Sequence, residues 1–98
     1  MRVTIHQADG EDVTMKIEGK IAGPTVPALQ QAWQVLAPSL GERKLLVDVR
    51  GVTHVDATGR NLLADIHAKT GANFLADTPL TKYFAEEARQ GIRTRSEY

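Results

Sequence analysis

Residues 44–59 read KLLVDVRGVTHVDATG, and this stretch decides the fold class. Its first part, Lys44–Val49, is nearly continuously apolar. Apolar runs of this length are typical of a strand covered on both faces, as in a parallel sheet. The stretch ends in Asp56-Ala57-Thr58-Gly59, where the carboxylate of Asp56 can cap a following helix by accepting hydrogen bonds from free backbone N–H groups. The sequence therefore predicts a strand that leads directly into a helix.

Downstream of this stretch, helical and strand patterns alternate. Apolar spacing predicts a second helix from about Thr58 to Lys69, and Gly71 is placed for its C-cap. Asn73–Ala76 is a short strand candidate, and Asp77-Thr78-Pro79 begins a third helix with a capping oxygen and a proline in its first turn. We expect one side of the third helix to face the core and the other to face solvent. The core-facing residues are Leu80, Tyr83, Phe84 and Ala88, and the solvent-facing residues are Lys82, Glu86, Glu87 and Arg89.

Upstream, the sequence predicts two strands and one helix. Arg2–Gln7 and the stretch Val13–Ile17 alternate apolar and polar residues, and an Asp-Gly pair between them favours the tight turn of an antiparallel hairpin. A helix begins near Thr25, and Pro38 and Gly41 end it. Its apolar face comprises Val26, Leu29, Ala32, Trp33 and Leu36.

The predicted element order is therefore β-β-α-β-α-β-α. Right-handed crossovers make the third and fourth strands parallel members of one sheet. We expect an α/β sandwich, with helices packed on a mixed central sheet of about four strands. The 98 residues make a single domain, 1–98, with its core over about 2–90 and a tail or short edge strand over 91–98.

Composition argues against several functional classes. Twelve basic and twelve acidic residues give a formal net charge of zero, which disfavours a general nucleic-acid binder. The absence of cysteine excludes disulfides, thiolate nucleophiles and cysteine-ligated metals. The three histidines lack metal-site spacing, and no apolar run approaches the roughly 18 residues of a membrane span. We expect a cytoplasmic domain with no metal, no cofactor and no membrane insertion.

Enzyme motifs are also missing from the sequence. Neither serine has the G-x-S-x-G context of a nucleophile elbow, and no glycine-rich phosphate loop is present. Asp48 and Asp56 are the carboxylates near the carboxyl end of a predicted strand, where α/β sheets place their sites. We interpret Asp48 as ordering a turn over Arg50–Thr53 through backbone N–H groups. No catalytic residues are predicted.

The stretch Leu46–Gly59 resembles the central motif of STAS domains, the fold of bacterial anti-sigma-factor antagonists. In that family a buried strand runs into a D-hydrophobic-x-x-V-x-x-hydrophobic-D-S-S/T-G loop that opens a helix. Ile17–Ile21 is similar to the family's L-x-G-x-L end of the second strand, and the likeness spans roughly Val3 to Gln90. The resemblance implies a non-enzymatic module of transcription regulation that binds an anti-sigma factor or serine kinase by partner switching.

The sequence departs from the family at the residue that carries the switch. In STAS antagonists the kinase phosphorylates the serine directly after the loop aspartate, and here Ala57 stands in that position. A methyl group has no oxygen to accept a phosphoryl group. Thr58 follows one residue later, turned by about 100° around the helix, and is retained as a candidate phosphorylation site. STAS domains generally continue with another strand and helix, whereas only residues 92–98 remain here.

The resemblance places partner binding on the Asp56–Gly59 loop and on the exposed face of the second helix. The predicted partner-binding residues are Asp56, Ala57, Thr58, Gly59, Arg60, Asn61 and Ala64. Three alternatives remain open: a loop that only caps the helix, a STAS subunit that steadies the ATPase of an ABC transporter in bacterial lipid trafficking, and a small-ligand or anion binder that uses the helix N–H groups. The expected oligomeric state is a monomer or a weak dimer.

Overall fold

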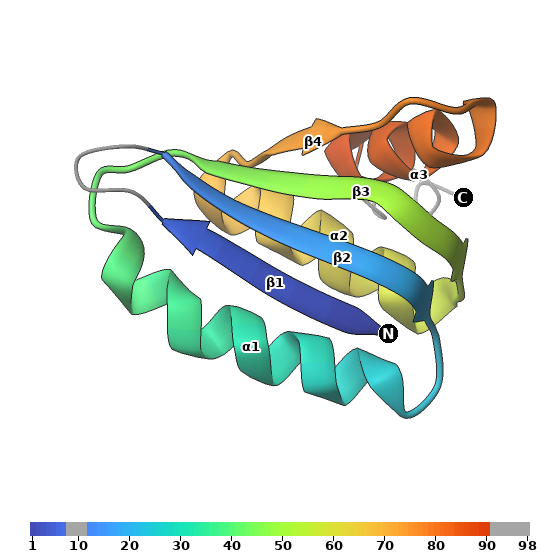
Figure 1. The fold of residues 1–98 in the computed structure, drawn as a ribbon, viewed down its shortest axis with the longest axis horizontal. Coiled ribbons are helices and arrows are strands. Elements are labelled where there is room, and N and C mark those ends of the chain that lie inside the picture. Colours follow the sequence, from blue (N-terminus) through green and yellow to red (C-terminus); the bar gives the residue numbers. More distant parts are fainter. Residues whose placement is uncertain (8–11, 91–98) are drawn as a thin grey trace, which may run out of the picture.

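The structure is a computed structural model that describes residues 1–7 and 12–90. Its order, β-β-α-β-α-β-α, confirms the predicted α/β class and the mixed sheet (Figure 1). The predicted Asp-Gly turn and the segment 91–98 lie outside the described residues. The elements are β1 Arg2–Gln7, β2 Val13–Ile21, α1 Thr25–Leu40, β3 Leu45–Val55, α2 Ala57–Thr70, β4 Asn73–Leu75 and α3 Pro79–Gln90.

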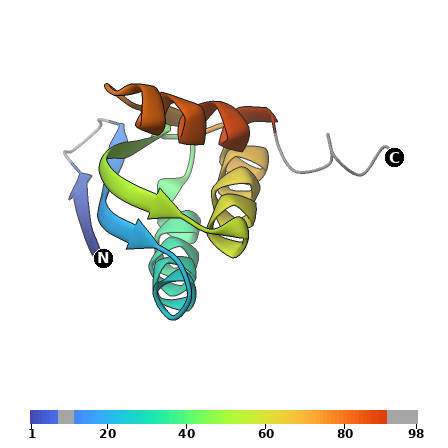
Figure 2. The ribbon, with the colours of Figure 1, turned by 90° about the vertical axis from the view of Figure 1, so that its right-hand side faces the viewer.

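The four strands form one sheet in the order β1-β2-β3-β4. β1 pairs antiparallel with β2, whereas β2 and β3, and β3 and β4, pair in parallel. The crossovers through α1 and α2 both move along the sheet in the same direction. Because each is right-handed, both helices lie on the same face. Figures 1 and 2 show this arrangement, with α3 beside α2 toward the β4 edge.

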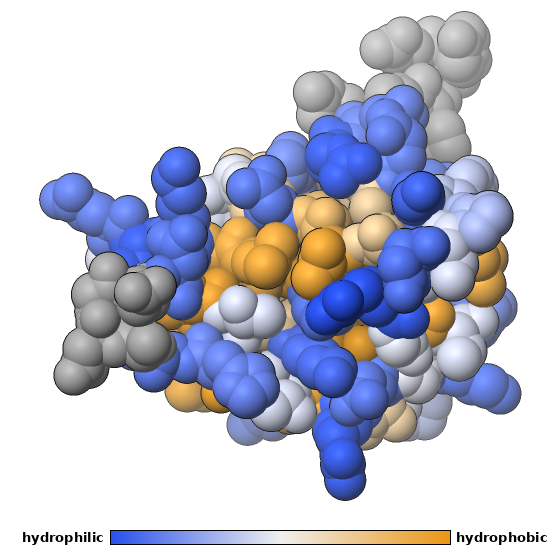
Figure 3. Space-filling view, turned by 45° about the horizontal axis from the view of Figure 1, so that its top comes forward, coloured by the Kyte–Doolittle hydropathy of each residue, from blue (hydrophilic) through white to orange (hydrophobic). Residues whose placement is uncertain are grey.

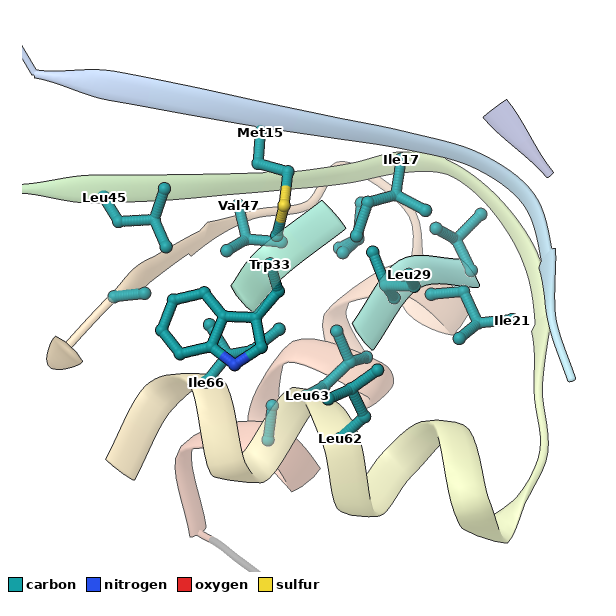
Figure 4. Close-up of a cluster of buried hydrophobic side chains, with 14 of the residues drawn as sticks. Met15, Ile17, Ile21, Leu29, Trp33, Leu45, Val47, Leu62, Leu63 and Ile66 are labelled. Atoms are coloured by element: carbon teal, nitrogen blue, oxygen red, sulfur yellow. The ribbon is translucent and has the colours of Figure 1, made fainter. Parts of the chain in front are cut away.

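The core lies between that face of the sheet and the two helices (Figure 4). Met15, Ile17 and Val47 of the sheet are fully buried, as is Leu29 of α1. Trp33 of α1 is only 5% exposed and belongs to the same cluster. The period-two pattern of β2 and the three-and-four spacing of α1 meet here. The residues predicted to face the core are buried in both elements except Ala32 of α1, which is only half-buried.

The opposite face of the sheet carries no helix among the described residues (Figures 1 and 2). The expectation that the strand at Lys44–Val49 is covered on both faces is therefore wrong, because both crossovers lie on one side. Leu46 and Leu75 are half-buried on the open face, where Leu46 is in register with Thr14, and Leu75 with Asp48. Figure 3 looks obliquely at this side and shows apolar side chains framed by hydrophilic ones.

Strand β3 continues through the segment expected to be a turn. Arg50–Thr53 remains extended because β2 offers partners along this stretch, with Glu18 opposite Gly51 and Gly19 opposite Val52. Register shifts between Lys16 and Glu18 let the two strands stay paired. The predicted turn is wrong, since pairing with a neighbouring strand overrides the local preference for a turn.

Helix α1 continues past the proline expected to end it. Pro38 lies inside the helix with its ring on the exposed side, and the helix ends at Leu40 before Gly41. A proline this close to the C-terminus removes a single backbone hydrogen bond. Leu40 is buried four residues after Leu36, so core packing favours the extra turn.

Helix α3 is rotated relative to its expected orientation. Leu80 and Tyr83 are 49% and 54% exposed, whereas Thr81 is buried. The Thr81 hydroxyl accepts hydrogen bonds from the backbone N–H groups of Asp77 and Thr78 at 3.1 and 3.0 Å. These bonds draw Thr81 inward and turn Leu80 and Tyr83 toward solvent. The residues buried in α3 are Thr81, Phe84, Ala85 and Ala88.

No described helix is long and apolar enough to cross a bilayer.

Candidate partner-binding site

Asp56 stands between the end of β3 and the start of α2 and acts as the predicted helix cap. Its backbone is extended, with φ −84° and ψ −179°. One carboxylate oxygen, Oδ1, accepts a hydrogen bond from the backbone N–H of Gly59 at 2.7 Å. This bond satisfies one of the free donors at the start of the helix. The capping role predicted for Asp56 is confirmed.

The other carboxylate oxygen of Asp56 binds a distant segment. Oδ2 accepts a hydrogen bond from the backbone N–H of Gly23, in the connection between β2 and α1, at 2.9 Å. The N–H groups of Gly23 and then Gly59 lower the pKa of Asp56, because they stabilise the charged carboxylate. The start of α2 is thus joined to the start of α1 through a single side chain.

Gly59 brings the first turn of α2 close to the sheet. A Cβ at this position would contact the carbonyl oxygen of Ile21, and it would lie 2.9 Å from Cγ2 of Ile21 and 3.0 Å from Cγ1 of Val55. Gly59 itself is buried. Its role is therefore close packing of α2 on β2 and β3, and it offers a partner protein no accessible surface.

The residues that do reach the surface lie around this first turn. Ala57, Thr58 and Asn61 are exposed. Thr58 and Asn61 also border an open groove between α1 and α2 with a volume of about 340 Å³. The groove has a buried apolar floor and a polar rim, and its lining residues are Val26, Gln30, Thr58, Asn61, Leu62 and Asp65.

Two predicted partner-binding residues face α3 instead of solvent. Ala64 is only 7% exposed, so the expectation that it belongs to an exposed face is wrong. Arg60 is half-buried, with Nε 3.4 Å from Oε1 of Glu87 in α3, and its Nη1 donates to the Val55 carbonyl at 3.3 Å. Ala64 lies four residues after Arg60 on the same flank of the helix. Packing of α3 on α2 buries this flank and draws Glu87 from its expected outward position into the contact.

Asp48, the second carboxylate considered from the sequence, has a separate environment. It is 4% exposed and accepts hydrogen bonds from the backbone N–H of Arg50 at 3.1 Å and from two guanidinium nitrogens of that residue at 3.0 Å. The pKa of Asp48 is lowered mainly by the hydrogen bonds from the Arg50 guanidinium. Asp48 lies in the middle of β3 and Asp56 beyond its end, so the two carboxylates do not converge on one site.

Metal-ligating side chains are not gathered in the part of the chain that the structure describes. No group of three or more histidine or carboxylate residues there could hold a metal ion. His67 of α2 is half-buried, and its Nδ1 lies 2.9 Å from the Ala72 carbonyl oxygen, a contact that joins the end of α2 to the segment before β4.

Sequence reasoning missed two residues that shape this site. Gly23 supplies the second hydrogen bond to Asp56, and Gln30 borders the groove from α1. Nothing local distinguishes either residue in the sequence. A topological signal did exist, because two right-handed crossovers in the same direction place α1 beside α2 and bring their first turns together.

No family model matches the chain, and no curated protein matches it. The function must therefore be argued from the residues of the site.

Proposed function

We propose that the chain is a non-enzymatic protein-interaction module that binds another protein through the start of α2. The binding surface comprises the exposed residues Ala57, Thr58 and Asn61 together with Gln30 and Asp65 at the rim of the groove. We call these five residues the α2-start surface. One observation carries the proposal: the Asp56 carboxylate holds Gly59 and Gly23 at once, and it leaves Ala57 and Thr58 exposed on a fixed backbone.

Preorganisation favours binding at this surface. A loop that is already held in one conformation loses little conformational entropy when a partner docks. Ala57 has no side-chain rotamers to lose, and Thr58 and Asn61 have short side chains. A mostly exposed polar rim over an apolar floor, as in the adjoining groove, is a common composition for a transient protein interface.

The resemblance to STAS domains suggests which class of partner to expect. On that basis, the partner is an anti-sigma factor or serine kinase, and the chain acts as an antagonist in partner switching. Ala57 offers no hydroxyl to a kinase, so binding lacks the family's usual off state. The exposed Thr58 hydroxyl is the one candidate acceptor on the α2-start surface.

The test is affinity capture from native cells with the wild-type chain and with Asn61→Arg, followed by mass spectrometry. The variant places a long cation in the middle of the α2-start surface. Gln31→Arg, which puts the same side chain on the exposed side of α1, is the matched control. Circular dichroism checks that all three chains fold equally well. We expect wild type and Gln31→Arg to retain the partner and Asn61→Arg to lose most of it.

The identity of the captured protein decides between the two regulatory roles. An anti-sigma factor or serine kinase supports the antagonist role. Capture of an ABC transporter ATPase would instead indicate that the chain is an accessory transport subunit that uses the same surface. Equal capture by Asn61→Arg and wild type would show that the partner binds elsewhere.

A further inference from the structure

A pocket opens between the C-terminal ends of α1 and α2, away from the α2-start surface at the other end of these helices. Its volume is about 320 Å³, which lies within the range of small-molecule sites. Buried apolar residues of α1 meet polar residues of the following turn and of the end of α2 in its lining. These residues include Trp33, Ala37, Leu40, Arg43, Lys69 and Thr70.

Trp33 brings a polar group without a partner into this lining. The side chain is only 5% exposed, and its Nε1–H has no hydrogen-bond acceptor among residues 1–7 and 12–90. In the same residues, Oε1 of Glu87 is the one fully enclosed side-chain atom that lacks a partner, so Nε1 of Trp33 keeps an opening to the outside. Figure 4 shows the indole nitrogen directed toward α2, the helix across the pocket. A buried indole N–H usually has an acceptor, and a ligand in the pocket can supply it.

Arg43 borders the pocket as a cation without an acidic partner among the described residues. Its guanidinium donates to the carbonyls of Ser39 and Leu40, which offsets the partial negative charge at the end of α1. The side-chain oxygen of Gln7, with its amide in the orientation that satisfies both groups, also accepts from Arg43. These bonds fix the guanidinium in place, and its positive charge stays uncompensated by any carboxylate.

Lys69 adds a second cation on the α2 side of the pocket. Its Nζ lies 3.2 Å from the carboxylate of Asp65, but both side chains are open to solvent and Asp65 does not line this pocket. The end of α2 also has a covered carbonyl, because the N–H of Gly71 donates to His67. The described lining therefore holds two cations and no acid, together with one unused N–H donor.

We infer that this pocket binds a small aromatic carboxylate. The carboxylate accepts a hydrogen bond from Nε1 of Trp33 and is attracted by the charges of Arg43 and Lys69. The aromatic ring packs against the apolar side of the pocket, formed by Ala37 and Leu40 beside the indole.

Charge and volume favour this ligand class over others. A cationic ligand would be repelled by Arg43 and Lys69, and a neutral apolar ligand would leave the indole N–H without an acceptor. An inorganic anion would leave the apolar side of the pocket uncovered. The inference does not depend on the proposed function, because this pocket and the groove beside the α2-start surface share no lining residue.

Nuclear magnetic resonance titration of the whole chain tests the inference. Trp33 is the only tryptophan, so its indole N–H gives a single, assignable peak in a nitrogen–proton spectrum. The probe is cinnamate, and cinnamamide is the control ligand because it has the same shape without the charge. Lys69→Gln removes one cation from the rim. Asp65→Asn is the matched control variant, since it breaks the same ion pair and keeps the cation.

We expect cinnamate to shift the Trp33 indole peak to saturation, with a dissociation constant of about 1 mM or below. Cinnamamide should bind at least about tenfold more weakly, because it offers no charge to the two cations. Lys69→Gln should weaken cinnamate binding by about two- to fivefold, and Asp65→Asn should bind it at least as tightly as wild type.

Two results would overturn the inference: an indole peak that does not move up to about 10 mM cinnamate, whether or not other peaks shift, and equal affinity for cinnamate and cinnamamide. Equal binding by Lys69→Gln and Asp65→Asn would contradict the role given to the lysine. Asn61→Arg, the variant expected to lose the protein partner, should bind cinnamate like wild type. The failure of one proposal is therefore distinguishable from the failure of the other.

Discussion

Helices α1 and α2 cover the same face of the sheet, yet different interactions hold them in place. The N-cap residue of α1, Pro24, offers no side-chain hydrogen bond, and no acidic residue occupies the first turn. α2 begins with the Asp56 cap and ends at Gly71, which has a left-handed backbone and donates its N–H to the His67 carbonyl at 2.7 Å. α2 also carries ion pairs to α3 and within itself, whereas α1 has no charged residue.

The exposed surfaces of the two helices therefore differ in how firmly their atoms are held. α1 is held by its buried stripe and by hydrogen bonds of the Thr25 and Arg43 side chains at its two ends, and it carries no ion pair. α2 is tied at both ends, so the atoms at its start are held in defined positions. A preorganised loop suits specific recognition.

The largest expected effect comes from breaking the buried stripe of α1. Leu29 is fully buried between the sheet and α2, so Leu29→Ala should lower the free energy of unfolding by about 2–5 kcal/mol through lost apolar burial and a residual cavity. Urea unfolding measures the change. Gln31→Ala, on the exposed side of the same helix, should stay within about 0.5 kcal/mol of wild type. A loss below about 1 kcal/mol for Leu29→Ala would contradict the view that packing holds α1.

A smaller effect, with an informative sign, is expected at the start of α2. Glycine to alanine within a helix normally stabilises by roughly 0.5–1 kcal/mol. Gly59→Ala should instead destabilise by about 1–3 kcal/mol, because the new methyl group would contact the Ile21 carbonyl and the Val55 side chain. Thermal and urea unfolding measure the sign, with the exposed Asn61→Ala as the control on the same helix. A more stable Gly59→Ala chain would show that α2 can move away from the sheet at no cost.

The smallest effect concerns the cap itself and is read from the pH dependence of stability. The folded-state pKa of Asp56 is lowered below its unfolded value of about 3.9, so its contribution is present above that value and is lost as pH falls through the folded pKa. Asp56→Asn keeps an oxygen that can accept from Gly59 but not the second acceptor for Gly23. The variant should be less stable at neutral pH and should lose less stability than wild type below about pH 4.

Urea midpoints at a series of pH values measure this difference. Asp48 also has a lowered pKa and remains in both chains, so some acid dependence persists in Asp56→Asn. Asp65→Asn removes the same charge from an exposed ion pair with Lys69 and serves as the control. Parallel pH profiles for wild type and Asp56→Asn would contradict the bridging role of the Asp56 carboxylate.

Local chemistry made several features predictable from the sequence. The Asp56 cap and the Gly71 C-cap depend on backbone donors and dihedral angles a few residues away, and both are confirmed. The alternation of Val13, Met15 and Ile17 correctly identified a strand with one face in the core. The errors fall where distant segments compete: β2 keeps Arg50–Thr53 extended, and α3 buries Ala64.

The candidate site divides in the same way. Asp56, Ala57 and Thr58 could be named from the sequence, because a capping aspartate exposes the residues directly after it. Their connection to Gly23 and the groove they share with Gln30 could not, since these contacts join segments more than twenty residues apart.

By itself the sequence determined the order of strands and helices, the α/β class and the start of α2, because periodicity and capping act over one or two turns of chain. Only the tertiary structure decided that none of the described helices covers one face of the sheet, that α3 covers Arg60 and Ala64, and that Ile5 and Val35 are exposed. The reason is physical: which side of an element meets water depends on the elements packed against it, and their positions follow from crossover handedness and strand pairing.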